Sequence, residues 1–401
     1  MKIAWFTNVP LLSNSSMQDG YNGGGWMYSL LGEICAMPGI ELVVFTEGND
    51  SNVSNGKFEQ RFISLRPKLK TVLKNRVRIL FGLSLNVEYL DLIYLRLARD
   101  LEKEMFDIVH IWGTEKSYGL VAKYTSIPLL VHIQGVLNSY QYFLSPYLPS
   151  SFKEYASIRK QLYYWKTLCK IEREVFEVNC VFAGRTKWDR SIIELLGGEN
   201  ARYIEMQEGL RQPFLLKDKA MNTSLVIEEN VRLVSVLSPP PYKGAYLIDE
   251  IHRNLEQSLN RKVVWIVIGT NEREAGNLKY IGRCSDVEIA EVFSNSDIYV
   301  HTSLIENSPN SICEAQTFGL PIVAGLSGGI ESLILNRESA ILVQPGDAMI
   351  YTAALIKMVK DYAQYKLNSL KQVEHILCRH DPLKLAMATI LEYENLIKHN
   401  V

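Results

Sequence analysis

Short apolar runs alternate with longer mixed segments along nearly the whole chain. Most runs are bounded by Gly, Asn or Pro and are rich in β-branched and aromatic residues, which is typical of strands buried on both faces of a sheet. In the first half these runs lie at 2–7, 41–47, 107–113, 128–135, 179–184 and 202–207. Helix-like segments, including 26–36 and 90–104, separate several of them. This alternation predicts the α/β class with a doubly wound parallel sheet.

The same pattern starts again near residue 231. The second set of runs lies at 231–238, 262–269, 279–283, 297–303, 321–325 and 340–345. The polar segment 215–229 has no clear strand and predicts a linker, and 382–399 predicts a last helix. We therefore expect two Rossmann-like domains, 1–212 and 213–381, that face a central cleft. Ligands of open parallel sheets bind beyond the carboxyl ends of the strands, so the chemistry is expected on the loops that follow them.

The composition is that of an ordinary globular protein, with 401 residues of which 47% are hydrophobic and 22% charged. The 43 basic and 44 acidic side chains give a net charge of −1, which disfavours a nucleic-acid partner. The six cysteines form no zinc or redox pair, which favours a cytoplasmic location. No run approaches the ~20 apolar residues that span a bilayer, so any membrane contact is expected to be peripheral.

The densest cluster of candidate chemistry follows the run 297–303. Ser308 is a suitable N-cap and Pro309 suits the first helical position, so a helix is expected to start here. The backbone amides of Asn310 and Ser311 then point out of the helix end. Together with the helix dipole, these amides predict an anion site.

Two glutamates flank this helix start. Glu306 lies on the loop before the helix, and Glu314 lies within the helix with its side chain leaning back toward the N-terminus. A carboxylate accepts hydrogen bonds from vicinal hydroxyls, and the amides hold a phosphate, which together fit a nucleotide sugar. The alternative is that Glu306 is an ordinary loop acid and Glu314 a solvated helix residue.

These residues resemble a known family signature. Glu306-x7-Glu314, followed by Gly-Leu-Pro at 319–321, resembles the motif of retaining glycosyltransferases of family 4, which have the GT-B fold. Lys-Gly at 243–244, three glycines at 23–25 and Gly-Gly-Ile-Glu at 328–331 fall in the order of that family. The resemblance implies a retaining hexosyltransferase of bacterial surface polysaccharide biosynthesis, which moves a sugar from a nucleotide-diphosphate sugar to a glycan or lipid-linked acceptor.

The resemblance also assigns roles to the domains. Domain 213–381 is expected to bind the donor and domain 1–212 the acceptor, with the helix 382–401 packing back on the first domain. No metal or other cofactor is implied, and neither Asp-x-Asp nor His-x-x-x-His occurs in the sequence. The leaving phosphate itself is expected to take the proton of the acceptor.

The resemblance assigns roles to single residues as well. Lys243 is expected to neutralise the donor diphosphate, which gains negative charge as the glycosidic bond breaks. Glu306 is expected to contact the donor sugar, and Glu314 the ribose hydroxyls. Gly24 and Gly25 permit close approach of backbone to phosphate, although a glycine triplet is also typical of a plain turn. The alternative for Lys243 is a surface loop lysine.

Two positions depart from the family pattern. Ser238 stands where many members carry a second cation, and Arg211 or Arg185 is a candidate replacement, although a structural role is favoured for Arg185. The position of the family's histidine is occupied by Gln134, which hydrogen-bonds but does not titrate. His132 lies on the same strand face and is a rival catalytic candidate, with a buried strand histidine as the alternative.

The segment Arg66–Arg78 has six basic residues and no acidic one. Leu69, Val72, Leu73 and Leu80 fall on one helical face, so the segment predicts a basic amphipathic helix. One interpretation is a surface that meets anionic lipid headgroups, or a lipid-diphosphate acceptor, on the inner face of the cell membrane. The other is a solvated helix face.

Two other functions are compatible with the same motifs. A GT-B-like sugar-nucleotide epimerase would turn over its nucleotide sugar without an acceptor. A non-catalytic nucleotide-sugar-binding protein would bind the donor without hydrolysis or transfer, and the departures at Ser238 and Gln134 keep this alternative open.

Overall fold

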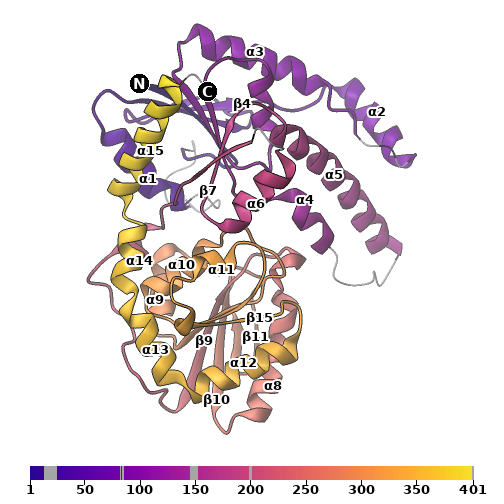
Figure 1. Ribbon diagram of the computed structural model, residues 1–401. Coiled ribbons are helices and arrows are strands. Elements are labelled where there is room, and N and C mark those ends of the chain that lie inside the picture. The colour runs from indigo at the N-terminus through magenta and orange to yellow at the C-terminus, as the bar shows by residue number, and fades with distance from the viewer. Residues whose placement is uncertain (13–24, 82, 84, 145–151, 198–200, 400–401) are drawn as a thin grey trace. The chain divides into compact units, whose positions relative to one another are not determined.

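A computed structural model describes residues 1–12, 25–81, 83, 85–144, 152–197 and 201–399. The chain forms two compact units, one of Met1–Gln207 with Pro382–Val401 and one of Glu208–Asp381 (Figure 1). The division comes a few residues before the expected boundary at 212. Leu210 already belongs to the apolar core of the second unit, which is why the second unit starts earlier.

The first unit contains one sheet of eight strands among its described residues, in the order β3-β4-β2-β1-β5-β6-β7-β8. All neighbours pair in parallel except β3 and β4. The strands are β1 (Lys2–Thr7), β2 (Glu41–Glu47), β3 (Val53–Ser54), β4 (Glu59–Ile63), β5 (Ile108–Trp112), β6 (Leu129–His132), β7 (Val181–Gly184) and β8 (Arg202–Glu205).

Helices cover both faces of this sheet. The described helices are α1 (Gly25–Ala36), α2 (Leu69–Leu80), α3 (Tyr89–Lys103), α4 (Leu137–Tyr140), α5 (Phe152–Phe176), α6 (Lys187–Leu196) and α15 (Pro382–Lys398). Alternate residues of β1 enter different cores: Ala4 and Phe6 pack with α3 and α5, whereas Ile3 and Trp5 pack with α1 and α15. The apolar run therefore has no polar face.

The last helix belongs to the first unit. Helix α15 lies beside α1 (Figure 1), and its Tyr393 hydroxyl accepts a hydrogen bond from Trp5 Nε1 at 2.9 Å. The same hydroxyl lies 2.5 Å from His110 Nδ1. One buried tyrosine thus ties the end of the chain to β1 and β5.

Strands β3 and β4 were not predicted from the sequence. The segment of β4, Glu-Gln-Arg-Phe-Ile, lacks an apolar pattern, yet Gln60 is completely buried. Its amide accepts from Leu11 N at 3.0 Å and donates to Val44 O at 3.2 Å. Pairing with β2 and these hydrogen bonds hold a polar strand in place, which hydrophobic periodicity does not detect.

The second unit contains seven described strands in the order β11-β12-β10-β9-β13-β14-β15, parallel except for β11–β12. They are β9 (Asn230–Val236), β10 (Lys262–Ile268), β11 (Arg273–Ala275), β12 (Leu278–Tyr280), β13 (Ile298–His301), β14 (Ile322–Gly325) and β15 (Ala340–Val343). The prediction of two doubly wound α/β sheets is confirmed.

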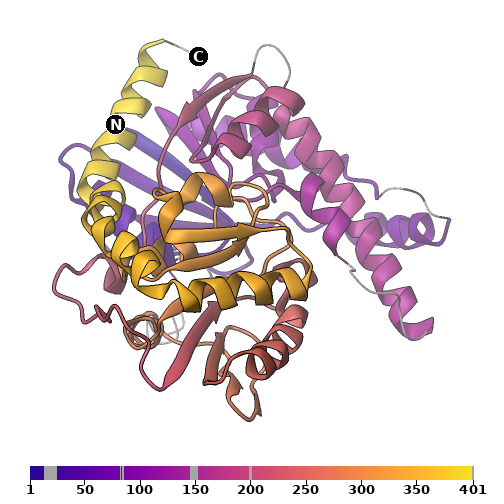
Figure 2. The ribbon, with the colours of Figure 1, turned by 60° about the horizontal axis from the view of Figure 1, so that its bottom comes forward.

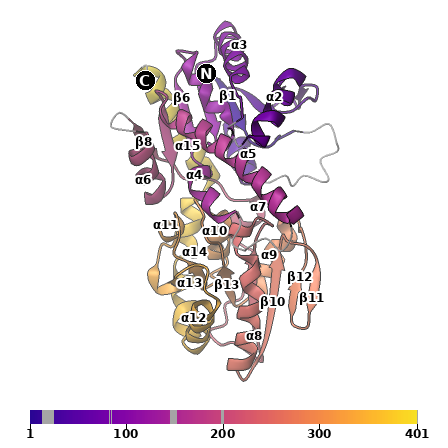
Figure 3. The same cartoon turned by 90° about the vertical axis from the view of Figure 1, so that its right-hand side faces the viewer.

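The helices of the second unit cover its sheet in two sets (Figure 3). Those described are α7 (Gln212–Leu215), α8 (Ile248–Ser258), α9 (Asp286–Ser294), α10 (Asn310–Thr317), α11 (Ile330–Leu333), α12 (Ala348–Lys360), α13 (Tyr362–Lys371) and α14 (Val373–Arg379). Helices α9 and α10 share an apolar core with β9, β13 and β14. Helices α8 and α12 pack on each other and against β10 and β15.

Candidate functional site

The strand order of the second unit defines where its ligand site is expected. From β9 the chain proceeds to β10 and β12 in one direction, and from β13 to β14 and β15 in the other. Neighbouring loops diverge at such a reversal, and the crevice between them is the usual ligand site of open parallel sheets. The loop after β9 carries Lys243, and the loop after β13 carries Glu306.

Backbone contacts hold these two loops together. Leu304 N donates to Tyr242 O at 2.7 Å, and Thr302 Oγ1 donates to Lys243 O at 3.2 Å. Gly244 has φ +70°, and a Cβ there would overlap the Thr302 carbonyl oxygen. The glycine of the Lys-Gly pair is therefore needed for geometry, because only glycine lets the loop after β9 approach the end of β13 this closely.

Lys243 and Glu306 form an ion pair. The carboxylate oxygen Oε1 of Glu306 also accepts from Ser303 Oγ at 2.9 Å and lies 3.5 Å from His301 Nε2. Burial raises the pKa of Glu306, but the Lys243 ammonium and His301 outweigh burial and lower the pKa to about 2. Glu306 is therefore ionised at neutral pH although it is only 5% exposed.

A third loop closes on Glu306. Gly329 N donates to Glu306 O at 3.0 Å, and Gly328 has φ +54° with its α-carbon so close that a Cβ would overlap the same carbonyl oxygen. The Gly-Gly pair at 328–329 thus contacts the backbone carbonyl of Glu306 and holds it in place. Three loops, from β9, β13 and β14, therefore meet at Glu306, the first two at its carboxylate and the third at its backbone carbonyl.

Helix α10 starts one residue later than predicted. Pro309 is the N-cap, with φ −66° and ψ 115°, and no side chain caps the helix, so the prediction of Ser308 as N-cap is wrong. The extended ψ of Pro309 places this residue outside the helix. Asn310 and Ser311 then occupy the first turn, where backbone amides have no carbonyl acceptor within the helix.

Side chains link the helix start to the ion pair. Tyr299 Oη donates to Ser311 Oγ at 2.8 Å and lies 3.2 Å from His301 Nδ1. His301 therefore stands between Tyr299 and Glu306. Sequence reasoning missed both Tyr299 and His301, and the only available signal was their position at the end of a strand that precedes the Glu306 loop. The amide oxygen Oδ1 of Asn310 is buried and has no hydrogen-bond partner within the described part of the chain.

Glu314 is not a solvated residue, because it is only 1% exposed. Its carboxylate accepts from Arg211 Nε at 2.7 Å and from Nη2 at 2.5 Å, and Arg211 Nη1 donates to Asp286 at 2.8 Å. Arg211 thus connects α10 with the start of α9. These contacts favour a bracing role for Arg211, whereas donor contact by Arg211 and ribose contact by Glu314 stay predictions.

The candidate residues of the first unit are less gathered. Gly23 and Gly24 lie outside the described residues, and Gly25 begins α1. Gln134 is half-buried just after β6. His132 is completely buried, with its ring 4.8 Å from that of Trp112, which favours the alternative of a buried strand histidine, whereas a catalytic role stays a prediction. The cause of this burial is that helices cover both faces of β6.

Arg185 also lies in the core, at 2% exposed, next to a helix start. Thr186 and Asp189 form a capping box at the start of α6, and Asp189 Oδ2 accepts from Arg185 N at 3.0 Å. The structural role favoured for Arg185 agrees with this position.

Polar residues that the sequence analysis did not select lie at the carboxyl ends of β1 and β5. Asn8 Nδ2 donates to Glu115 Oε2 at 3.1 Å. Behind them, the buried Glu172 of α5 accepts from Thr114 Oγ1 at 2.8 Å and from Leu137 N at 2.9 Å. Glu172 thereby fixes the loop that carries Gln134. Asn8 and Glu115 are far apart in the sequence and meet because β1 and β5 are neighbours in the sheet.

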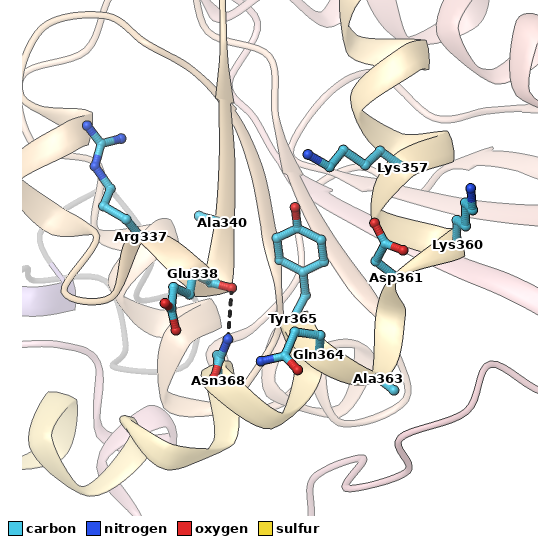
Figure 4. Close-up of a pocket in the computed structure, with 10 residues that line it drawn as sticks. All are labelled: Arg337, Glu338, Ala340, Lys357, Lys360, Asp361, Ala363, Gln364, Tyr365 and Asn368. Atoms are coloured by element: carbon cyan, nitrogen blue, oxygen red, sulfur yellow. Dashed lines mark hydrogen bonds between the residues drawn. The ribbon is translucent and has the colours of Figure 1, made fainter.

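A surface hollow of about 720 Å³ lies elsewhere in the second unit, beside β15 and helices α12 and α13 (Figure 4). Side chains of both charges line it, including Lys357, Lys360 and Asp361. None of the candidate site residues lines this hollow. Within the described residues, no group of three or more His, Cys, Asp or Glu side chains is placed to hold a metal ion.

Comparison with known structures identifies the fold. Sucrose-phosphate synthase from Thermosynechococcus elongatus superposes with a TM-score of 0.69 at 13% identity, over 99% of both chains. WaaG, a glycosyltransferase involved in lipopolysaccharide biosynthesis, gives 0.65 at 14% identity over 96% of this chain and 98% of its own. HepE from Anabaena, solved with UDP-glucose, gives 0.65 at 14% identity over 98% and 100%. The chain has the GT-B fold.

The sequence comparisons each cover only part of the chain. Residues 229–361 match the family described as Glycosyl transferases group 1, and this segment contains Lys243, Glu306 and Glu314. The Escherichia coli UDP-Gal:alpha-D-GlcNAc-diphosphoundecaprenol alpha-1,3-galactosyltransferase is 26% identical over 136 residues, which cover 30% of this chain and 34% of that protein. The probable sucrose-phosphate synthase 5 of Oryza sativa is 32% identical over 68 residues, 17% of this chain and 7% of that protein. Together these findings support a GT-B glycosyltransferase.

Proposed function

We propose that this protein is a retaining glycosyltransferase that transfers a hexose from a nucleotide-diphosphate sugar to a glycan or lipid-linked acceptor. The observation that carries the proposal is the Lys243–Glu306 ion pair at the strand-order reversal of the second unit. This pair lies inside the segment that matches the glycosyltransferase family. Structural neighbours solved with UDP and UDP-glucose support a nucleotide sugar as the donor.

The donor diphosphate is expected at the positive side of this site. Lys243 and the first-turn amides of Asn310 and Ser311 supply cationic and dipolar donors. A phosphate that approaches Lys243 competes with Glu306 for the ammonium, and Glu306 then becomes available to accept from sugar hydroxyls. Because the leaving diphosphate gains negative charge in the transition state, Lys243 stabilises that state more than the ground state.

The acceptor is expected at the first unit, near Gln134. The glutamine side chain hydrogen-bonds a hydroxyl without taking its proton. The proton passes to the leaving phosphate, so no titrating base of the protein is needed. Among similar proteins, the E. coli galactosyltransferase acts on a diphosphoundecaprenol-linked sugar and AmsK of Erwinia amylovora serves amylovoran biosynthesis. Surface polysaccharide assembly is therefore the proposed pathway.

The proposal is tested first by donor binding and turnover. Calorimetric titration with UDP-, GDP- and ADP-sugars should identify one donor, and slow release of the nucleoside diphosphate from that donor should be measurable without acceptor. Lys243→Ala should reduce this release by about 100-fold or more, because one preorganised charge at the leaving group is lost. Lys279→Ala is the matched control, since Lys279 pairs with Glu274 on the surface of the same unit.

The outcomes separate the three candidate functions. Release or transfer that depends on Lys243 supports the transferase. A changed sugar on an intact nucleotide indicates the epimerase, and donor binding without any turnover indicates the binding protein. Equal activity of Lys243→Ala and the control would remove Lys243 from the site. Circular dichroism of both variants checks that the fold is kept.

A further inference from the structure

Helix α2 turns its apolar face toward solvent. None of its residues is buried. Its apolar stripe follows helical spacing, every member is more than half exposed, and Leu80 reaches 79%. The stripe consists of Leu69, Leu73, Val77 and Leu80. An ordinary surface helix turns such a stripe to the core and its polar side to water, so α2 has the opposite orientation.

The inner side of α2 carries Asn75 between Val72 and Ile79, all three half-buried, so Val72 does not belong to the exposed stripe. Asn75 Nδ2 donates to Asn86 O at 3.2 Å, and Asn75 Oδ1 accepts from Asn86 N at 2.7 Å. Figures 1 and 2 show α2 beyond the end of α3, away from the sheet of its unit. The fold thus anchors the helix through an asparagine and presents its leucines outward.

Cations flank the apolar stripe. At 100° per residue, Lys70 and Lys74 lie on one side of the stripe and Arg76 on the other. Arg66 and Lys68 precede the helix, and all five side chains are exposed. Helix α2 contains no acidic residue. In a chain whose net charge is −1, this is a local concentration of positive charge.

We propose that α2 lies in the plane of an anionic lipid membrane, with its leucines among the acyl chains and its cations at the level of the lipid phosphates. An exposed apolar stripe with flanking Lys and Arg is the chemistry of interfacial helices. A second copy of α2 is a poor partner, because it brings like charges together. A nucleic acid satisfies the cations but leaves the stripe in water. The proposal does not rest on glycosyl transfer, because lipid binding is measured without turnover.

The charge part of the proposal is tested by co-sedimentation of the full chain with vesicles. Wild-type protein should bind an equal mixture of phosphatidylcholine and phosphatidylglycerol, and binding should weaken as salt is added. Each lysine near an anionic surface should strengthen binding roughly 5-fold. The triple variant Lys68→Gln, Lys70→Gln and Lys74→Gln should therefore bind about 100-fold more weakly.

A control with the same change of charge lies on the second unit. Lys357, Lys360 and Lys371 are exposed on α12 and α13. Replacing all three with glutamine should leave vesicle binding unchanged. Equal losses in the two triple variants would mean that net charge, and not α2, governs the binding, and would overturn the proposal.

The apolar part needs a second pair of variants. Leu73→Ala with Val77→Ala should weaken binding at least 10-fold, because methylene groups no longer enter the acyl region. Helix α15 offers the matched control, since Leu383 and Met387 have the same spacing and are also more than half exposed. Leu383→Ala with Met387→Ala should bind vesicles like wild type.

The remaining outcomes each decide the proposal. Failure of wild-type protein to bind the anionic vesicles, or equal binding to phosphatidylcholine alone, overturns it. A dimer that the Leu73 and Val77 changes dissolve would show that α2 meets a second copy instead. Since no residue of α2 is buried, all variants should keep the circular dichroism spectrum and the donor binding of wild type.

Discussion

Replacing Arg211 with methionine should strongly destabilise the second unit. Arg211 is 5% exposed, and its guanidinium bonds Glu314, which is 1% exposed, and Asp286. Removing the cation leaves the Glu314 carboxylate buried beside an apolar side chain. Breaking a buried ion pair by deleting one partner costs about 3–5 kcal/mol, which is a large part of the stability of a domain.

The two partners together form a thermodynamic cycle. Glu314→Gln alone removes the charge and keeps the shape, and Arg211→Met with Glu314→Gln removes both charges. The double variant should be more stable than the sum of the single effects predicts, by about 1.5 kcal/mol or more. Arg337→Ala is the control, because its ion pair with Glu331 is about half exposed on both sides and should contribute at most about 1 kcal/mol.

The assay must report on the second unit alone, because a chain of two units does not unfold in a single two-state step. Trp265 is the one tryptophan between residues 208 and 381, and it is completely buried. Urea unfolding of fluorotryptophan-labelled protein, followed by the ¹⁹F resonance of Trp265, therefore measures the stability of this unit. A loss below about 1 kcal/mol for Arg211→Met, or additive effects in the cycle, would refute the view that the pair braces α9 and α10.

Three further predictions concern a glycine, the last helix and pH. Gly244→Ala should lower stability by about 1–3 kcal/mol and impair donor binding in calorimetry, because its Cβ meets the Thr302 carbonyl. Gly276→Ala is the control, since Gly276 has a similar φ of +63° but lies in open space, and this variant should leave donor binding intact. Tyr393→Phe should cost the first unit about 1–3 kcal/mol in urea unfolding, since a buried indole N–H and a buried imidazole lose their partner; an unchanged midpoint would contradict this. Burial, with a smaller contribution from the neighbouring histidine, holds the pKa of His110 well below its usual value of 6.5. Below pH 6.5 the unfolded chain therefore binds a proton at this site that the folded chain does not, so the contribution of His110 to stability should be constant above that pH and fall below it, by at most about 1.4 kcal/mol per pH unit. His110→Gln should remove this contribution, so the difference in stability between wild type and variant should change with pH below 6.5 and stay constant above it.

Several elements were predictable because their sequence patterns are local. The apolar runs of both sheets coincide with strands, since a strand covered on both faces needs apolar residues at successive positions. The loop with Glu306 was selected because a helix-start pattern follows such a strand, and the Lys-Gly pair at 243–244 because it resembles a family motif. Strand β4 was missed because hydrogen bonds of Gln60, and not apolar side chains, fix its position.

The site itself was only half predictable. The sequence analysis placed Lys243 and Glu306 at strand ends, and the structure pairs them. It weighed a ribose-binding role of Glu314 against a solvated helix residue, and it did not predict that Arg211 holds this carboxylate in the interior. It left His132 open between a catalytic residue and a buried strand histidine, and the structure shows that helices on both sides of the sheet bury it. Burial depends on which helices cover a strand, and periodicity within the strand does not contain that information.

The sequence by itself determined the α/β class, the two sheets and the loops on which charged residues stand, because these follow from patterns within a few residues of each other. The tertiary structure decided which of those residues meet. Arg211 and Glu314 are 103 positions apart, Lys243 and Glu306 are 63 apart, and Trp5 and Tyr393 are 388 apart. Such partners are chosen by the order of strands in the sheet and by the helices that cover them, and that order is settled only when the whole core packs.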